Sequence, residues 1–162
     1  MPVVSTSQDL EALTLTLVAD LAAPPSRVWQ VWADPRQLER WWGPPGWPAT
    51  FTEHDVVPGG TSRYYMTGPE GERAGGWWRI IAADEPRSLE FEDGFADESG
   101  APDPGLPTTR AHVDLEEAPA GTRMTITSRF ASLEQMDQLI EMGMEEAMAQ
   151  AVGQLDDLLA PV

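Results

Sequence analysis

Hydrophobic and polar side chains alternate in seven segments along the chain. In the first segment, residues 12–22, Leu13, Leu15 and Leu17 alternate with threonine and valine. A repeat of two residues that is rich in β-branched side chains is typical of a β-strand. The same alternation predicts six further strands, over residues 51–57, 62–67, 75–83, 88–93, 109–116 and 122–130. Gly and Pro separate these segments at short intervals, which favours an antiparallel meander.

Two short helices are expected between the first two strands. The first begins after Pro24-Pro25 and places Val28, Val31 and Trp32 on one helical face. Asp34-Pro35 ends this helix and opens the second one.

A long helix is predicted near the C-terminus. Ser132 is a favourable N-cap, and Gln135 completes a capping box with it. Apolar residues then recur at helical spacing through residues 133–159. One face of the antiparallel sheet is apolar and needs a cover, and only this helix is large enough. The fold class is therefore α+β, with a curved antiparallel sheet of about six to seven strands around the long helix.

The length of 162 residues suits a single domain. We expect its core to span about residues 12–160, preceded by a flexible N-terminal segment, residues 1–11. An acidic loop is predicted over residues 94–107, where Phe95 and Leu106 are the only large apolar residues. A loop this long inside a compact domain is usually functional or disordered.

Charge and composition narrow the classes of partner. The net charge is −17, and all ten basic residues are Arg. This acidity disfavours nucleic acids and anionic membrane surfaces, which both require cationic patches. The chain has no Cys, no secretory signal and no apolar stretch long enough to span a membrane, so we expect a cytoplasmic protein without membrane contact.

A series of short motifs occurs in a fixed order within residues 12–160. Its members are Val28-Trp29, Trp32, Asp34-Pro35, Leu38, Trp41-Trp42-Gly43-Pro44, Asp55, Pro58-Gly59-Gly60, Arg63, Met66, Gly68-Pro69-Glu70-Gly71, Pro86, Leu89, Phe91, Gly121-Thr122-Arg123-Met124-Thr125-Ile126 and Gly143-Met144. The series resembles the activator of heat-shock-protein-90 ATPase homologue-like family, within the SRPBCC superfamily of START and birch-pollen-allergen-like proteins. The resemblance implies the helix-grip fold, in which a curved sheet grips a long helix, often around an apolar cavity. The superfamily includes lipid carriers, cyclases, hydrolases, hormone receptors and chaperone cofactors, so the fold does not decide the function.

The sequence departs from the family pattern at two places. Ser62 stands where many relatives carry a large aromatic residue, which predicts a larger pocket. Ala147 and Met148 stand where Gly and often Trp are common, which predicts a different pocket floor.

The space between sheet and helix is the strongest candidate for a binding site. Alternation and helical spacing direct the following residues into it: Trp32, Ser62, Tyr64, Met66, Trp78, Ile80, Phe91, Met124, Met136, Ile140, Gly143, Met144, Ala147 and Met148. The flexible methionines suit an adaptable wall around an apolar small molecule. The alternative is that the same side chains pack against one another as a filled core.

Aromatic residues after the second helix are candidates for the mouth of such a pocket. They are Trp41, Trp42 and Trp47, and the loop residues Phe95 and Leu106 are candidates for its lid. The alternative is that the tryptophans only cover the open end of the sheet.

The polar residues provide no recognisable catalytic set. His112 lies two residues from Asp114 on the solvent side of a strand, His54 lies between two acids, and neither supplies a metal site. Arg63 is expected to pair with Asp55 across neighbouring strands. Catalytic residues, metals and cofactors are therefore not assigned.

Three functions remain open. The first is a non-catalytic module that binds an apolar or aromatic small molecule. The second is a cyclase- or hydrolase-like enzyme that uses Tyr64 and His54, and the third is a co-chaperone-like interaction module. A homodimer is compatible with the exposed sheet edges.

Overall fold

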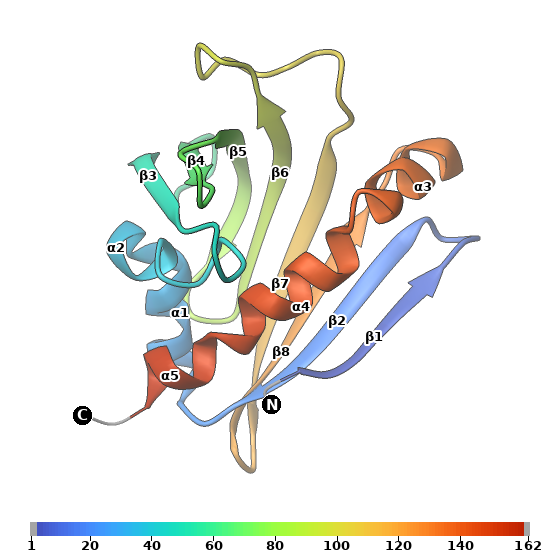
Figure 1. Ribbon diagram of the computed structural model, residues 1–162. Coiled ribbons are helices and arrows are strands. Elements are labelled where there is room, and N and C mark those ends of the chain that lie inside the picture. The colour runs from blue at the N-terminus through green and yellow to red at the C-terminus, as the bar shows by residue number, and fades with distance from the viewer. Residues whose placement is uncertain (1–2, 161–162) are drawn as a thin grey trace.

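The computed structural model describes residues 3–160 and has an α+β architecture (Figure 1). Its eight strands are β1 (Val3–Asp9), β2 (Thr14–Leu21), β3 (Ala49–His54), β4 (Thr61–Thr67), β5 (Arg73–Asp84), β6 (Ser88–Ala96), β7 (Thr109–Ala118) and β8 (Gly121–Arg129). Its helices are α1 (Pro25–Ala33), α2 (Pro35–Leu38), α3 (Leu133–Glu141), α4 (Met144–Gly153) and α5 (Leu155–Leu159).

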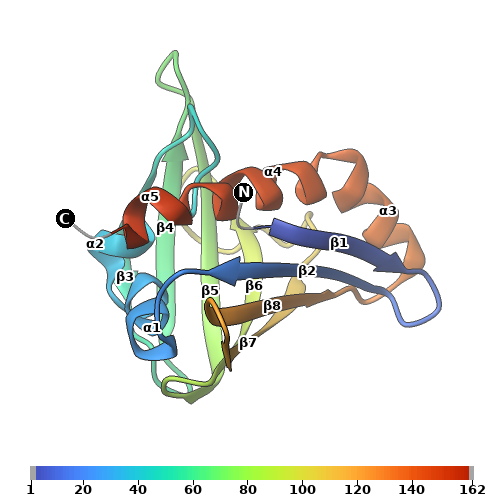
Figure 2. The same cartoon turned by 90° about the horizontal axis from the view of Figure 1, so that it is seen from below.

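The strands form one antiparallel sheet in the order β1-β2-β8-β7-β6-β5-β4-β3. Strands β3 to β8 follow one another as the predicted meander, and β2 closes against β8. The sheet is strongly curved, so that β1 and β2 run across the direction of β4 and β5 (Figure 2). The helices α3, α4 and α5 lie along its concave side, and α1 and α2 close one end (Figures 1 and 2). This arrangement is the expected helix-grip fold.

The strand count exceeds the predicted six to seven because residues 3–9 form β1 instead of a flexible segment. Most of β1 is polar and exposed, so its sequence shows no hydrophobic alternation. Backbone pairing with β2 holds it in place. The side chains of Thr6 and Gln8 also donate hydrogen bonds to the Glu145 carboxylate on α4, at 3.4 and 2.8 Å.

The predicted single helix over residues 133–159 is divided into three. Its start is as expected, because the Ser132 hydroxyl accepts a hydrogen bond from the Gln135 backbone N–H at 3.2 Å. The first break lies at Met142 and Gly143, where Gly143 has a φ of 93°. This left-handed conformation favours glycine and cannot continue a right-handed helix. The second break lies at Gln154, between α4 and α5.

A bulge in β3 changes the predicted ion pair. The register between β3 and β4 shifts between Phe51 and Glu53, which brings Glu53 opposite Arg63. Arg63 Nε therefore lies 3.4 Å from Glu53 Oε2, and the expected pair with Asp55 is replaced. Asp55 follows the end of the strand.

The acidic loop begins later than predicted, because β6 continues through Ala96. Gly94 and Phe95 are thus strand residues. The loop that follows turns around the Asp97 carboxylate, which accepts hydrogen bonds from the backbone of Ser99 and Ala101 at 2.9 and 3.1 Å. Beyond the loop, β7 begins at Thr109, which pairs with Asp93 of β6.

The core lies between the sheet and the helices. Its largest fully buried side chains include Trp32 from α1, Trp41 after α2, and Trp78 and Phe91 from the sheet. A second, smaller cluster lies beneath α3 and contains Leu15, Phe130, Met136 and Leu139. Over residues 3–160, none of the helices combines the length and apolar character needed to cross a bilayer.

Candidate functional site

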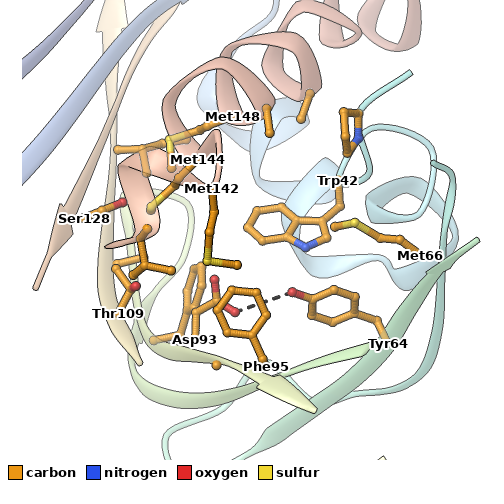
Figure 3. Close-up of a pocket in the computed structure, with 18 of the residues that line it drawn as sticks. Trp42, Tyr64, Met66, Asp93, Phe95, Thr109, Ser128, Met142, Met144 and Met148 are labelled. Atoms are coloured by element: carbon orange, nitrogen blue, oxygen red, sulfur yellow. Dashed lines mark hydrogen bonds between the residues drawn. The ribbon is translucent and has the colours of Figure 1, made fainter. Parts of the chain in front are cut away.

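A cavity of about 280 Å³ lies between the curved sheet and the break that separates α3 from α4 (Figure 3). Strands β4, β6, β7 and β8 supply one wall, and α3 and α4 supply the facing wall. The third side comes from α1 and from the segment after α2. The chain's own side chains leave this space unfilled.

Many of the predicted pocket residues line this cavity. From the candidates between sheet and helix, these are Trp32, Tyr64, Met66, Phe91, Gly143, Met144, Ala147 and Met148. From the mouth and lid candidates, they are Trp41, Trp42 and Phe95.

The remaining candidates lie outside the cavity wall. They are Ser62, Trp78, Ile80, Met124, Met136 and Ile140, together with Trp47 and Leu106. Trp78 stacks behind Phe91, with ring centroids 4.0 Å apart, so that only the Phe91 ring reaches the cavity. The Met124 sulfur accepts a hydrogen bond from the Trp32 indole N–H at 3.4 Å, one layer below the wall. Met136 and Ile140 belong to the cluster beneath α3.

Ser62 does not enlarge the cavity, because it is fully buried against His54. The Ser62 hydroxyl lies 2.7 Å from His54 Nδ1, and His54 Nε2 lies 2.7 Å from the Trp32 carbonyl oxygen. That oxygen can only accept, so Nε2 donates to it, and in the neutral ring Nδ1 then accepts from the Ser62 hydroxyl. Burial lowers the pKa of His54, in agreement with this neutral form. The pair joins the end of α1 to β3 and β4, and neither residue lines the cavity.

One carboxyl group interrupts the largely apolar wall. Asp93 on β6 lines the cavity, and its Oδ1 accepts a hydrogen bond from the Tyr64 hydroxyl at 3.5 Å (Figure 3). Burial raises the pKa of Asp93 to about 7, and the hydrogen bond from Tyr64 opposes this rise. Burial also raises the pKa of Tyr64 well above its usual range, so the phenol stays protonated.

Asp93 is a wall residue that was not predicted, because its strand was expected to end there and the next residues were assigned to a loop. The signal was nevertheless present. Leu89 and Phe91 alternate on the inner face of β6, and the same period of two directs Asp93 and then Phe95 inward. The other missed wall residues include the buried hydroxyls of Thr109 and Ser128 and the helix-break residue Met142.

A glycine positions the Tyr64 ring beside Asp93. Gly76 on β5 is the register partner of Tyr64 on β4. A Cβ atom at Gly76 would collide with the ring and hydroxyl of Tyr64. The absence of a side chain at this place therefore lets the phenol lie flat against β5 and reach Asp93.

Several aromatic rings line the cavity beside Asp93. Trp42 lies at the centre of this group of rings. Its ring centroid is 5.7 Å from that of Trp41, 5.9 Å from that of Trp32 and 6.2 Å from that of Tyr64, and all three contacts are edge to face. The backbone that carries Trp42 is fixed by Gln154, whose Nε2 donates to the carbonyl oxygens of Trp41 and Gly43 at 3.1 and 2.8 Å. The wall around Trp42 is therefore held rigidly.

The opposite wall consists of smaller and more flexible side chains. Gly143 and Ala147 provide little side-chain volume, and three methionines, Met142, Met144 and Met148, surround them (Figure 3). Methionine side chains adapt to irregular shapes because they are unbranched and flexible. The cavity thus combines a rigid aromatic wall with an adaptable one.

Residues 22–160 match the family model described as activator of Hsp90 ATPase homolog 1-like protein. The chain belongs to this family. No match was found among curated proteins.

Solved structures of similar proteins share the fold of this family member. Protein Ms6760 from Mycobacterium smegmatis is 47% identical, with a TM-score of 0.92 and 99% of each chain covered. A protein from Arthrobacter aurescens is 55% identical, with a TM-score of 0.91, over 94% of this chain and 89% of that one. A protein from Rhodobacter sphaeroides is 27% identical, with a TM-score of 0.83, over 98% and 99% of the two chains.

The two departures from the family pattern have different structural consequences in this member. Ala147 and Met148 lie in the cavity wall, at the position expected for its floor. Ser62 instead hydrogen-bonds to His54 outside the wall. The open space therefore comes from the helix side of the molecule and not from the small residue on β4.

Proposed function

We propose that this protein binds an apolar or aromatic small molecule in the cavity beneath the helix break. The observation that carries the proposal is the unfilled, largely apolar space of about 280 Å³ between the sheet and the helices. Protein interiors normally contain few voids larger than a water molecule. Ligand sites, in contrast, are concave, mostly apolar and lined with aromatic side chains and a few polar groups.

The size of the cavity suits a ligand with one or two rings, since pockets for drug-sized molecules begin at roughly 300 Å³. The methionines around Gly143 support some variation in ligand shape. Binding would remove the ligand's apolar surface from water, at about 25 cal/mol per Å².

A cavity-filling variant provides the test. Ala147→Leu adds bulk inside the cavity, whereas Gln150→Leu adds the same side chain on the exposed side of the same helix. We expect a panel of aromatic compounds and short-chain lipids to quench the tryptophans of the cavity wall and to raise the melting temperature. Ala147→Leu should weaken both responses, and Gln150→Leu should not.

The proposal fails if no compound of the panel binds, or if bound compounds respond equally to the two leucine variants. The second result would place binding elsewhere on the molecule.

Asp93 supports a second candidate, an enzyme that uses this carboxyl as a general acid or base. Its pKa of about 7 lies in the range that suits proton transfer at neutral pH. We expect the parent protein to turn over ester or polyketide-like substrates slowly, and we expect Asp93→Asn to lose this turnover. Equal product formation by both proteins would exclude it.

A further inference from the structure

Asp93 is a partly buried acid that lines the cavity without a positively charged partner. Its Oδ1 accepts the Tyr64 hydroxyl, and no donor to Oδ2 is found within residues 3–160. None of the described residues that line the cavity is Arg or His. Buried carboxylates in proteins are usually paired with a cation or fully hydrogen-bonded, because an isolated buried charge is costly.

Every neighbouring element presents an uncharged group to Asp93. Tyr64 faces Asp93 from β4. The register partners of Asp93 are Trp78 on β5 and Thr109 on β7. The segment between α3 and α4 adds Met142 and Met144 to the same cavity. The site therefore has a negative group and no counter-ion of its own.

Aromatic side chains lie near this group. Trp42, Tyr64 and Phe95 lie on the same side of the cavity as the Asp93 carboxyl (Figure 3). Aromatic rings attract cations through the negative charge density of their faces, and the attraction strengthens when water is excluded. A carboxylate beside several rings is thus suited to a cation that also has apolar surface.

We propose that the ligand carries a protonated amine on an apolar or aromatic body, and that the Asp93 carboxylate binds this nitrogen. The proposal rests on the proposed function and specifies its ligand class. The amine would donate to the free Oδ2, and its apolar body would fill the space between Trp42 and the methionines. The bound cation supplies the charge that the cavity wall lacks.

The net charge of the whole molecule also favours a cationic ligand. At a net charge of −17, the protein attracts cations and repels anions at long range. An anionic ligand would additionally meet Asp93 inside the cavity. A neutral alcohol can enter but gives this carboxylate no counter-charge, so it should bind more weakly than the matched amine.

Three compounds with the same aromatic body test the proposal by titration calorimetry. They are naphthylmethylamine, naphthylmethanol and naphthoate. We expect the amine to bind about tenfold more tightly than the alcohol, which corresponds to one charge-assisted hydrogen bond, and naphthoate to bind most weakly.

Two variants localise the preference. In Asp93→Asn the preference for the amine over the alcohol should disappear. Glu92→Gln removes the same charge from the neighbouring strand position, where Glu92 pairs with Arg79, and should keep the preference. The two variants together separate a specific contact from the general effect of net charge.

The dependence on pH gives an independent readout. Between pH 6 and pH 8, about one unit on either side of the Asp93 pKa of about 7, the ionised fraction of this carboxyl rises about tenfold. The affinity for the amine should rise in parallel, because the amine stays protonated over this range. In Asp93→Asn the affinity should be constant.

The possible failures are distinguishable. If the alcohol binds as tightly as the amine and Asp93→Asn changes nothing, the amine inference is overturned while the proposed binding function stands. An affinity for the amine that falls with rising pH would overturn it as well. If none of the compounds in either panel binds, the proposed function fails too.

Discussion

The Tyr64 hydroxyl lies 3.5 Å from Asp93 Oδ1, and the two side chains come from strands that are separated by β5. The contact is possible because Gly76 on the intervening strand leaves the space that the Tyr64 ring occupies. Asp93, in a largely apolar cavity, thereby accepts one hydrogen bond from a neutral donor, the Tyr64 hydroxyl. This donor stabilises the ionised form of Asp93, but burial has the larger effect.

Removal of this donor should change the titration of Asp93. In Tyr64→Phe the hydrogen bond that favours the carboxylate is lost, while the burial that disfavours it remains. We expect the pKa of Asp93 to rise further above about 7, measured by carbon-detected NMR of the carboxyl group. Tyr65→Phe is the matched control, because the Tyr65 ring contacts Arg73 instead. An unchanged Asp93 pKa in Tyr64→Phe would show that the two groups do not interact in solution.

The burial of Asp93 should make stability depend on pH. Because the folded pKa is raised from 3.8 to about 7, the folded state binds more protons than the unfolded state between these values. The free energy of unfolding must then fall as pH rises through this window. At pH 8 the cost is at most about 4 kcal/mol. Asp93→Asn removes it, so we expect the variant to be more stable than the parent at pH 8 by denaturant titration. Equal stability would indicate that water reaches the carboxyl freely.

His54 should have the opposite effect on the pH dependence. Burial lowers its folded pKa, so the unfolded state binds the extra proton as pH falls below the unfolded value of about 6.5. The free energy of unfolding should therefore decrease on acidification. Because the Asp93 effect overlaps this window, the measurement belongs in the Asp93→Asn background. There, His54→Gln should abolish the acid-induced loss. His112→Gln, which alters a half-buried ring bonded to Glu90 and Asp114 on the outer side of the sheet, should retain it.

Two glycines of the C-terminal helices should respond to alanine with opposite signs. Gly143 has a φ of 93°, which an alanine adopts only with strain, so Gly143→Ala should destabilise by about 1 kcal/mol. Gly153 ends α4 with open space around its Cα and no positive φ, so Gly153→Ala should stabilise by up to about 1 kcal/mol. Thermal unfolding of both variants measures the difference. Stabilisation by Gly143→Ala would mean that the helix break is absent in solution.

The sequence predicted the strands that alternate buried apolar side chains with exposed polar ones. Strands β2 to β8 each bury one face, so their periodicity is visible in the residue pattern. Strand β1 was missed because its pairing depends on backbone hydrogen bonds and on contacts with Glu145, which leave no hydrophobic pattern. The break at Gly143 was missed because a single glycine inside an apolar helical stripe is compatible with either a continuous or a broken helix.

The candidate site was predicted to the extent that it follows the same periodicity. Tyr64, Met66 and Phe91 point inward from alternating strand positions and line the cavity. Trp78 points inward too, but Phe91 lies in front of it, and such layering depends on the curvature of the sheet. Asp93 follows the same period of two from Leu89 and Phe91, but it stood at the predicted end of its strand and was not selected among the 27 acidic residues.

The contacts of α4 have a consequence for how a ligand would enter. At one end of this helix Glu145 is bound by side chains of β1, and just beyond the other end Gln154 holds the backbone beneath Trp42. A displacement of α4 would therefore disrupt the edge strand and the aromatic wall together. Met142, at the break between α3 and α4, lines the cavity and is also 56% exposed, which places the entrance route at this break and not beneath α4.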